Sequence, residues 1–387
     1  MRKIPSNLSD RVLDSIREEA KEFDQASVQC GIIGVTGTGK SSLINALAGK
    51  EIAEVGVKET TGIQSEISSY NFRNIILVDL PGVGTSTWTT ENYFSDLIKL
   101  SSGKENYSLQ PEGFDFFILV LANRVLADDL KLYQLITQTY KKRCYLVRSK
   151  FDIDAENNYR TKRKSDEETH KEILVDLWKS FKTEDRSRIF IISTAEPSRG
   201  DFEALENAIL ENLPKIKADK FLAYSSVHSR NLVKKKRKIA EKHANRIAII
   251  SACNTLNPIP GLDFAADVGL LLKLSQDLLD IYGLSLDQLD YEVQMHLKSE
   301  AWGIAFKRRM AMSLKSYTTI EGILITLRAL APRVEVKNLV KWLPVVGQSL
   351  AVLISYKLTF SYALGAINKF EGQALTMLNE LEAGIQI

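Results

Sequence analysis

Short apolar runs alternate with helix-patterned or polar stretches between residues 29 and 214. Each run holds four to eight residues, mostly Val, Ile, Leu and Phe, which is typical of strands buried on both faces of a sheet. Because strands that alternate with helices form parallel sheets, the pattern predicts an α/β domain with a doubly wound, mostly parallel sheet. The predicted strands are residues 31–35, 75–78, 114–121, 144–147 and 189–192. Two polar segments, residues 101–111 and 154–169, lack hydrophobic periodicity, so we expect both to be surface insertions.

A second domain is predicted from the two ends of the chain. The strand pattern ends at Pro214, and apolar residues recur at helical spacing over residues 215–387, which predicts an all-α helical domain. Within residues 1–28, Ser9 provides an N-cap for an apolar stripe at helical period. A lone amphipathic helix needs an apolar surface, so we expect this helix to pack on the helical domain. The sheet domain is then residues 29–214.

Composition and charge narrow the class of protein. The chain has 387 residues, of which 44% are hydrophobic, enough for more than one core. Its 51 Lys and Arg residues nearly balance its 48 Asp and Glu residues, so no nucleic-acid partner is expected. The three cysteines are far apart and lack metal-ligand spacing, which fits reduced thiols. The N-terminus has no apolar signal sequence, and we expect a cytoplasmic protein.

A phosphate-binding loop follows the first predicted strand. The sequence GVTGTGKS at residues 34–41 fits the Walker A pattern and precedes a helical run. Glycine N–H groups can curl around phosphates, Lys40 can reach the β- and γ-phosphates, and the Ser41 hydroxyl can bind Mg²⁺. A glycine-rich turn without nucleotide is the alternative, but strand, loop and helix together favour nucleotide binding. The residues expected at the nucleotide are Gly34, Thr36, Gly37, Thr38, Gly39, Lys40, Ser41 and Ser42.

A second metal ligand is predicted where another strand ends. The sequence DLPG at residues 79–82 closes the run of residues 75–78, at the edge of the sheet where such folds bind ligands. The Asp79 carboxylate would hold Mg²⁺ through water, and the Gly82 amide would contact the γ-phosphate. An ordinary strand-to-turn sequence is the alternative. Beside a Walker A loop, however, the motif indicates that a nucleoside triphosphate is hydrolysed or sensed.

A third motif indicates the base. The sequence RSKFD at residues 148–152 follows a predicted strand and resembles the Asn/Thr-Lys-x-Asp guanine motif, with Ser149 at the first position. Asp152 can accept hydrogen bonds from the ring N–H and amino group of guanine, whereas adenine would leave its carboxylate unpaired. A solvated loop of mixed charge is the alternative. The motif predicts GTP and GDP as ligands, bound by Ser149, Lys150, Asp152, Ser193 and Thr194, the last two in a short loop over the base.

With these motifs in this order, the chain resembles the immunity-related GTPases, an interferon-inducible family of dynamin-like character. The likeness covers most of residues 1–387. It includes GVKETT at residues 56–61, similar to the family's switch I, and DLPGVG at residues 79–84, similar to its switch II. Residues 114–117 and 145–148 resemble its central strands.

The resemblance implies further site residues. Thr61 would be the switch I threonine that binds Mg²⁺, with Thr60 as the fallback, and Glu59 would lie at a nucleotide-dependent dimer interface. The metal ligands expected are therefore Ser41, Thr61 and Asp79, and the catalytic residues expected are Lys40, Thr61, Glu59 and Gly82.

Val83 follows the Asp-x-x-Gly motif, at the position where many small GTPases carry a glutamine that orients the attacking water. A valine cannot hydrogen-bond water, so slow hydrolysis by the monomer is expected. We hypothesise that two G domains meet across their nucleotides in a homodimer or larger oligomer, and that each completes the other's site. The alternative is a surface valine, with another residue of the same chain acting on the water.

The helical half contains two apolar stretches, residues 264–275 and 350–356, which resemble the family's helical region. Charged residues interrupt each stretch before about 18 apolar residues accumulate, so a transmembrane span is not expected. Buried core helices are one interpretation, and a domain that inserts into or lies on lipid is the other. The basic run KKKRK at residues 234–238 is likewise either a solvated helix face or a site for an anionic membrane surface.

Three functions stay open at this point. The leading hypothesis is a Mg²⁺-dependent GTPase that hydrolyses GTP to GDP and phosphate, is activated by dimerisation, and acts in the cytoplasm or as a peripheral protein on intracellular membranes. The second is a GTP-gated scaffold with negligible hydrolysis, which a single-turnover assay would distinguish. The third is an RNA- or ribosome-assembly GTPase. The low net charge and the lack of an aromatic-basic stripe after residue 214 stand against it.

Overall fold

The structure, a computed structural model, describes residues 6–55, 67–83, 88–100, 107–121, 124–182, 186–254, 262–296, 300–333 and 347–385. The chain divides into two compact units. One, Gln25–His228, contains the sheet, and the other is helical and is formed by Met1–Asp24 with Ser229–Ile387. The boundary lies beyond residue 214, where the strand pattern ends, because α8 (Lys215–Tyr224) packs against two central strands.

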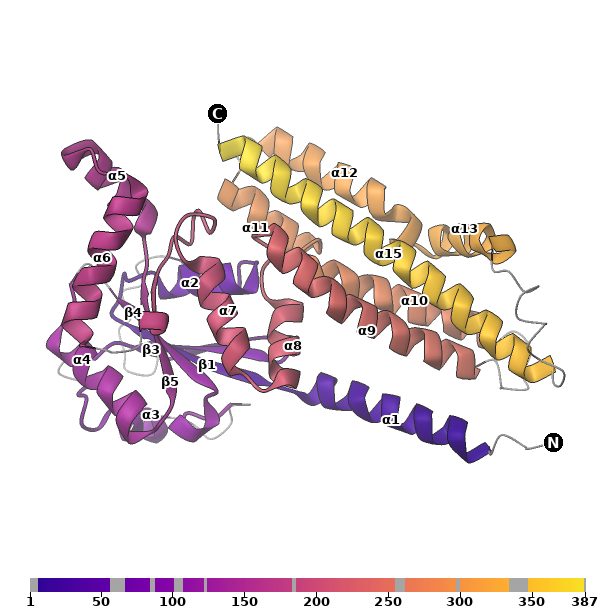
Figure 1. Cartoon of the computed structure of the whole chain (residues 1–387), viewed down its shortest axis with the longest axis horizontal. Coiled ribbons are helices and arrows are strands. Elements are labelled where there is room, and N and C mark those ends of the chain that lie inside the picture. Colours follow the sequence, from indigo (N-terminus) through magenta and orange to yellow (C-terminus); the bar gives the residue numbers. More distant parts are fainter. Residues whose placement is uncertain are drawn as a thin grey trace. The chain divides into compact units, whose positions relative to one another are not determined.

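Within the described residues, the sheet unit has six strands in the order β2-β3-β1-β4-β5-β6 (Figure 1). The central strand β1 (Val28–Gly34) pairs in parallel with β3 (Ile75–Pro81) and β4 (Phe116–Leu121). The parallel order continues through β5 (Arg143–Arg148) and β6 (Ile189–Ile191). Every residue of β1 and β4 is buried, as expected of strands covered on both faces. The predicted mostly parallel sheet is confirmed.

The sixth strand, β2 (Ser68–Phe72), was not predicted. It pairs antiparallel with β3 at the edge of the sheet, and only its last residue is buried. Its sequence, SSYNF, contains no apolar run, since an edge strand with partly exposed residues needs none. Hydrophobic patterning alone therefore missed it.

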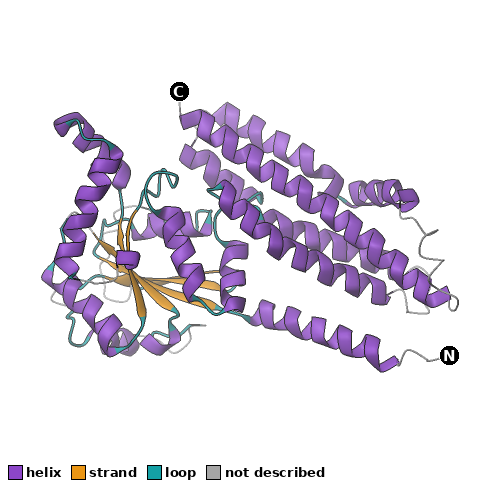
Figure 2. Cartoon of the chain, in the orientation of Figure 1, coloured by secondary structure: helices purple, strands orange, loops and turns teal. Residues whose placement is uncertain are grey.

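Helices cover both faces of the sheet (Figures 1 and 2). On one face, α3 (Tyr93–Leu100), α4 (Ala127–Gln134) and α6 (Asp166–Phe181) share a continuous hydrophobic core with the strands. The other group is α2 (Lys40–Ala48), α7 (Phe202–Asn212) and α8. There the Tyr145 hydroxyl donates to the Ala208 carbonyl at 2.8 Å, and the Phe116 and Phe221 rings lie 6.3 Å apart.

Residues 154–169 lie mostly at the surface, as expected, but they are helical and not an insertion between elements. They lie in α5 (Phe151–Lys162) and in the start of α6. α5 and the first turn of α6 bury few residues, so residues 154–169 lack an apolar stripe, whereas the rest of α6 packs on the core through residues such as Leu177 and Phe181. In the other predicted insertion, residues 101–106 lie outside the described residues, whereas Leu109 is buried in the core of the sheet unit.

The helical unit is built around two long helices, α9 (Arg230–Asn254) and α15 (Gly347–Ile385), which lie side by side (Figure 1). The N-terminal helix α1 (Ser6–Gln25) contacts α9: the Phe23 ring lies 5.1 Å from that of His243, and Glu19 pairs with Arg246. The remaining helices described are α10 (Leu262–Ile281), α11 (Leu286–His296), α12 (Glu300–Thr318) and α13 (Ile320–Leu330).

The basic run at residues 234–238 lies on α9, but it is not one solvated face. Lys236 is fully buried. Arg237 forms ion pairs with Glu241 on its own helix and with Glu371 on α15. At least Lys236 and Arg237 are therefore engaged within the helical unit, so the run as a whole cannot lie on a lipid surface. No helix in the described parts of the chain combines the length and apolarity needed to cross a membrane.

Candidate nucleotide-binding site

The Walker A loop joins the central strand to α2. β1 ends at Gly34, and α2 begins at Lys40 with Gly39 as its N-cap. Gly37 and Gly39 have φ angles of +83° and +92°, in the left-handed region that favours glycine. The Leu43 N–H donates to the Gly39 carbonyl at 2.9 Å, so the N–H groups before it in this turn have no intrahelical acceptor. Such a helix end is a ready site for an anion.

Two further glycines allow neighbouring backbones to approach this loop. A Cβ atom at Gly34 would lie 2.6 Å from the Val120 carbonyl oxygen. A Cβ atom at Gly82 would lie 2.6 Å from the Val35 nitrogen. Larger residues at these positions would push the strand ends apart. Gly82 thus stands beside the Walker A loop, and its contact with a γ-phosphate stays a prediction.

Lys40 and Asp79 form an ion pair where α2 and β3 meet. Lys40 Nζ lies 3.7 Å from Asp79 Oδ1, and the side chains are only 13% and 16% exposed. Asp79 Oδ1 is buried and has no hydrogen-bond partner among the described residues. Burial raises the pKa of Asp79 to about 6, although the nearby Lys40 charge opposes this shift. A buried carboxylate oxygen without a hydrogen bond is suited to a cation or its bound water, so these residues fit Mg²⁺.

The protein alone supplies few metal ligands here. In the described residues there is no group of three or more His, Cys, Asp or Glu side chains that could hold a metal ion. A Mg²⁺ at this site would depend on phosphate oxygens and water for most of its ligands, as is usual for Mg²⁺ beside nucleotides. Ser41, in the first turn of α2, and Asp79 are the described candidates from the protein.

The predicted guanine motif lies against the Walker A loop. Ser149, which is 4% exposed, donates a hydrogen bond from Oγ to the Thr38 carbonyl. Lys150 donates from Nζ to the Gly37 carbonyl at 2.7 Å. The short serine side chain therefore reaches the loop, which explains how it can stand at the first position of the motif. The two bonds hold the base-side loop to the phosphate-side loop.

Asp152 lies in the first turn of α5, where a helix N-terminus stabilises a carboxylate. It is partly buried, and no hydrogen bond or ion pair joins it to another described residue. Its carboxylate is therefore available to a ligand. The preceding Arg148 is 6% exposed and pairs with Asp154, an ion pair that the sequence analysis missed because it did not consider Asp154.

The loop after β6 joins the same region. The Phe151 N–H donates to the Ile192 carbonyl at 3.0 Å, which connects the start of this loop to the guanine motif. Ser193 is fully buried, and its Oγ accepts a hydrogen bond from the Glu196 N–H at 2.9 Å. The Ser193 hydroxyl thus helps to order the loop, and its contact with a base stays a prediction. Thr194 beside it is partly buried.

A cavity of about 410 Å³ lies between the Walker A and guanine-motif loops. This volume falls within the range of about 300 to 1,000 Å³ that is typical of ligand pockets. Its lining residues are Thr36, Gly37, Thr38, Leu121, Arg124, Leu126, Arg148, Ser149 and Lys150. The sequence analysis did not assign Leu121, the last residue of β4, or Arg124 and Leu126 beyond it to the site, because that segment carries no motif. The exposed Arg124 places a cation at the rim of this cavity.

The predicted switch I residues Glu59, Thr60 and Thr61 lie outside the described residues. Val83 lies inside them, is 2% exposed, and belongs to the hydrophobic core of the sheet unit. The alternative of a surface valine is therefore wrong. The side chain at the position of the missing glutamine packs among apolar residues instead of facing a substrate water.

Known proteins similar to this chain are interferon-inducible GTPases. The model of the family described as "Interferon-inducible GTPase (IIGP)" matches residues 2–321. Interferon-gamma-inducible GTPase 10 of Mus musculus is 30% identical over 53% of this chain and 48% of its own length. T-cell-specific guanine nucleotide triphosphate-binding protein 2 of Mus musculus is 28% identical over 82% of this chain and 79% of its own length. The chain thus spans as little as 48% of the length of a relative that it matches.

Solved structures are more distant. Toc33 from Arabidopsis thaliana, in complex with GDP and Mg²⁺, has a TM-score of 0.33 and 17% identity, over 55% of this chain and 92% of that one. The LeoA bacterial dynamin GTPase from ETEC has a TM-score of 0.34 and 12% identity, over 97% and 93%. Both TM-scores are too low for these likenesses to support a conclusion about this chain.

Proposed function

Because the chain belongs to the interferon-inducible GTPase family, whose members are GTP hydrolases, we propose that it binds GTP with Mg²⁺ and hydrolyses it to GDP and phosphate. The observation that supports this most directly is the pair of hydrogen bonds from Ser149 and Lys150 to the Walker A loop. They hold a motif suited to guanine, with Asp152, against a loop suited to phosphates. A guanine nucleotide carries both groups in one molecule.

In this proposal the chain's own residues bind and orient the triphosphate. The N–H groups of the Walker A loop and of the first turn of α2 donate to phosphate oxygens, and Lys40 offsets the charge on the β- and γ-phosphates. The Gly82 amide contacts the γ-phosphate. Ser41, Asp79 and, by resemblance, Thr61 would hold the metal, with Asp79 acting through water. When bound, Mg²⁺ neutralises charge that develops on the phosphates during transfer.

We propose activation by dimerisation, which the burial of Val83 supports. Its side chain cannot orient the attacking water, and it is enclosed by core residues. A second copy that faces the nucleotide could supply the missing polar group, with Glu59 at the interface. This proposal makes the homodimer the active species and the monomer slow.

Steady-state hydrolysis tests both parts of the proposal. We expect GTP turnover that requires Mg²⁺, with a rate per monomer that rises over about a hundredfold range of protein concentration because dimers form by mass action. Lys40→Ala should abolish turnover and weaken GTP binding, whereas Lys99→Ala, which removes an exposed lysine of α3, should not. A flat rate per monomer would exclude activation by dimerisation. Tight GTP binding without single-turnover hydrolysis would instead favour a GTP-gated scaffold.

We also propose that the protein is cytoplasmic and associates peripherally with membranes, and one observation in the helical unit favours this association. Helix α13 is strongly apolar, yet Ile320 and Ile325 are 57% and 58% exposed, and only Ile323 is buried. The exposed Arg328 lies one turn further along. Apolar side chains beside a cation are typical of helices that lie in the headgroup region of anionic bilayers.

Vesicle sedimentation tests this association. Ile325→Asp should reduce binding to vesicles that contain an anionic lipid. Ile153→Asp, at a residue that is 51% exposed on α5 in the sheet unit, serves as the matched control and should bind like the unmodified chain. Equal binding by the two variants would argue against a lipid role for α13.

A further inference from the structure

The loop that follows β6 is closed at its base by the backbone. Ile192 and Gly200 form an antiparallel bridge, and the Asp201 N–H donates to the Ile191 carbonyl at 2.7 Å. Asp201 Oδ2 in turn accepts from the Ile191 N–H at 3.0 Å. Gly200 has a φ of +95°, and a Cβ atom there would lie 2.4 Å from the Ile191 oxygen. Both ends of the loop of residues 193–199 are therefore fixed by these contacts beside β6.

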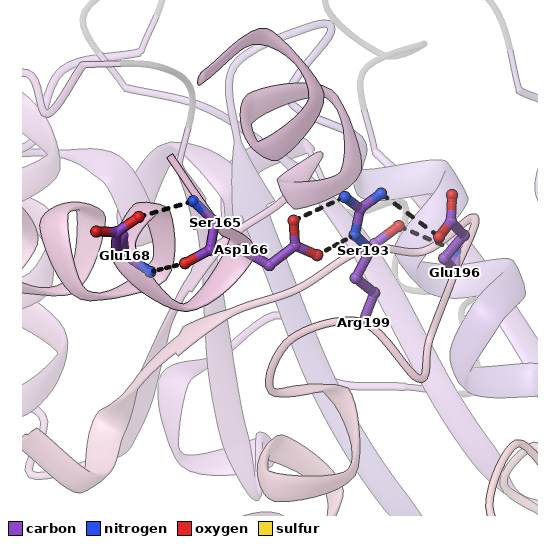
Figure 3. Close-up of polar contacts among 6 residues, drawn as sticks. All are labelled: Ser165, Asp166, Glu168, Ser193, Glu196 and Arg199. Atoms are coloured by element: carbon purple, nitrogen blue, oxygen red, sulfur yellow. Dashed lines mark hydrogen bonds and ion pairs between the residues drawn. The ribbon is translucent and has the colours of Figure 1, made fainter. Parts of the chain in front are cut away.

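Arg199, directly before Gly200 at the C-terminal end of this loop, holds the loop to α6 (Figure 3). Its guanidinium donates from two nitrogens to the two carboxylate oxygens of Asp166, one of them at 2.9 Å. Its third nitrogen lies 3.6 Å from Glu196, whose N–H binds the buried Ser193 hydroxyl. A two-point arginine–carboxylate pair fixes orientation as well as distance, which a single lysine contact does not. One side chain thus connects both ends of the loop to α6.

Asp166 is itself held in place by a capping box (Figure 3). The Glu168 N–H donates to Ser165 Oγ at 3.2 Å, and the Ser165 N–H donates to Glu168 Oε2 at 2.8 Å. These reciprocal bonds fix the first turn of α6, where Asp166 follows the N-cap. The hydrogen bond from Arg199 lowers the pKa of Asp166, so the pair is charged near neutral pH.

The clamped loop lies next to Asp152. The preceding residue, Phe151, donates its N–H to Ile192 at 3.0 Å, and its ring would lie 3.4 Å from a Cβ atom at Gly200. The hydrogen bond with Asp166 is the main cause of the raised pKa of Arg199, and the charge of Asp152 makes the smallest contribution. No hydrogen bond joins Arg199 to Asp152 among the described residues, so the carboxylate stays open to a base.

We propose that the Arg199–Asp166 ion pair is a positioning element for guanine recognition, which holds residues 193–199 beside Asp152 and so aligns that carboxylate with the exocyclic amino group of the base. The proposal rests on guanine-nucleotide binding at this site. Arg199 touches no nucleotide in it and acts through the loop. Its effect is therefore on the choice of base and not on the chemistry at the phosphates.

A comparison of GDP with inosine diphosphate tests this role, because hypoxanthine keeps the ring N–H and lacks the amino group. We expect the full chain to bind GDP more tightly. Arg199→Ala and Asp166→Asn should each reduce that preference about fivefold, the loss of one partly exposed charge-assisted contact. The double variant should lose no more than either single variant. Arg199→Lys should retain part of the preference, and kcat at saturating GTP should stay within about twofold.

The control is Arg160→Ala, which removes an arginine whose pair with Glu156 is on the exposed surface of α5. It should leave both dissociation constants unchanged. An equal loss of GDP and inosine diphosphate binding in folded Arg199→Ala, or no loss, overturns the proposal. If Arg199→Ala does not fold by circular dichroism, Asp166→Asn decides, since it keeps the shape of the side chain. Failure of the unmodified chain to bind guanine nucleotides would instead overturn the proposed function.

Discussion

Lys40 Nζ lies 3.7 Å from Asp79 Oδ1, and its positive charge partly compensates a buried carboxylate oxygen that has no hydrogen bond within the described parts of the chain. The two side chains come from the start of α2 and the end of β3, which the sheet brings together. A buried charge without full compensation costs folding free energy until a ligand or metal completes its surroundings.

Asp79→Asn is expected to stabilise the nucleotide-free chain above about pH 6. Burial raises the pKa of Asp79 to about 6, so this group favours folding at low pH, and that contribution is lost as the pH rises through the folded-state pKa. The asparagine variant cannot ionise and so avoids this loss of folding stability, which amounts to at most about 3 kcal/mol. Melting temperatures of the variant and of the unmodified chain, measured in EDTA over about pH 5 to 8, show which of the two is more stable.

The matched control for that variant is Asp96→Asn, in an exposed pair with Lys99 on α3. It should change the melting temperature little at any pH. With Mg²⁺ and GDP present, the unmodified chain should melt at a higher temperature than Asp79→Asn, because its carboxylate then has a cation to hold. A lower melting temperature for Asp79→Asn at pH 8 in EDTA would contradict the argument.

Ser149→Ala should weaken GDP binding about fivefold or more. The variant removes the bond from Ser149 Oγ to the Thr38 carbonyl, so the guanine motif loses one of its two attachments to the Walker A loop. Ser149→Thr keeps a hydroxyl and should retain most of the affinity. Titration of a fluorescent GDP analogue measures the change. Ser95→Ala, which removes an exposed hydroxyl on α3, should bind as the unmodified chain does.

The phosphate and base motifs could be predicted because each is local. The Walker A loop needs only a strand, glycines at positive φ and a helix in order along the chain, and the sequence displays all three. The contact between Arg199 and Asp166 spans 33 residues, and no local pattern marks it. The edge strand β2 and the burial of Val83 also depend on neighbours in space, which a single sequence does not reveal.

Val83→Gln is expected to destabilise the sheet unit without making the monomer a faster GTPase. The residue is 2% exposed among core side chains, so a glutamine there must bury an amide or leave the core. Burial without partners costs about 2 kcal/mol or more. Urea unfolding measures the loss, and Val55→Gln, at a residue that is 62% exposed, should lose little. A stable variant with a faster monomer would mean that the segment can turn this side chain to the nucleotide.

Gly49→Ala should destabilise the chain by about 1 to 2 kcal/mol. Gly49 caps the C-terminus of α2 with a φ of +63°, and a Cβ atom there would lie 3.0 Å from Ser226 Cβ. The two segments cannot separate freely, because the Ser226 N–H donates to the Leu47 carbonyl at 3.0 Å. Gly372→Ala is the control of opposite sign: it lies inside α15 with no atom within 4 Å of the added Cβ, and alanine favours a helix there by about 1 kcal/mol. If Gly49→Ala and Gly372→Ala shift the melting temperature in the same direction, the argument from backbone strain at Gly49 is wrong.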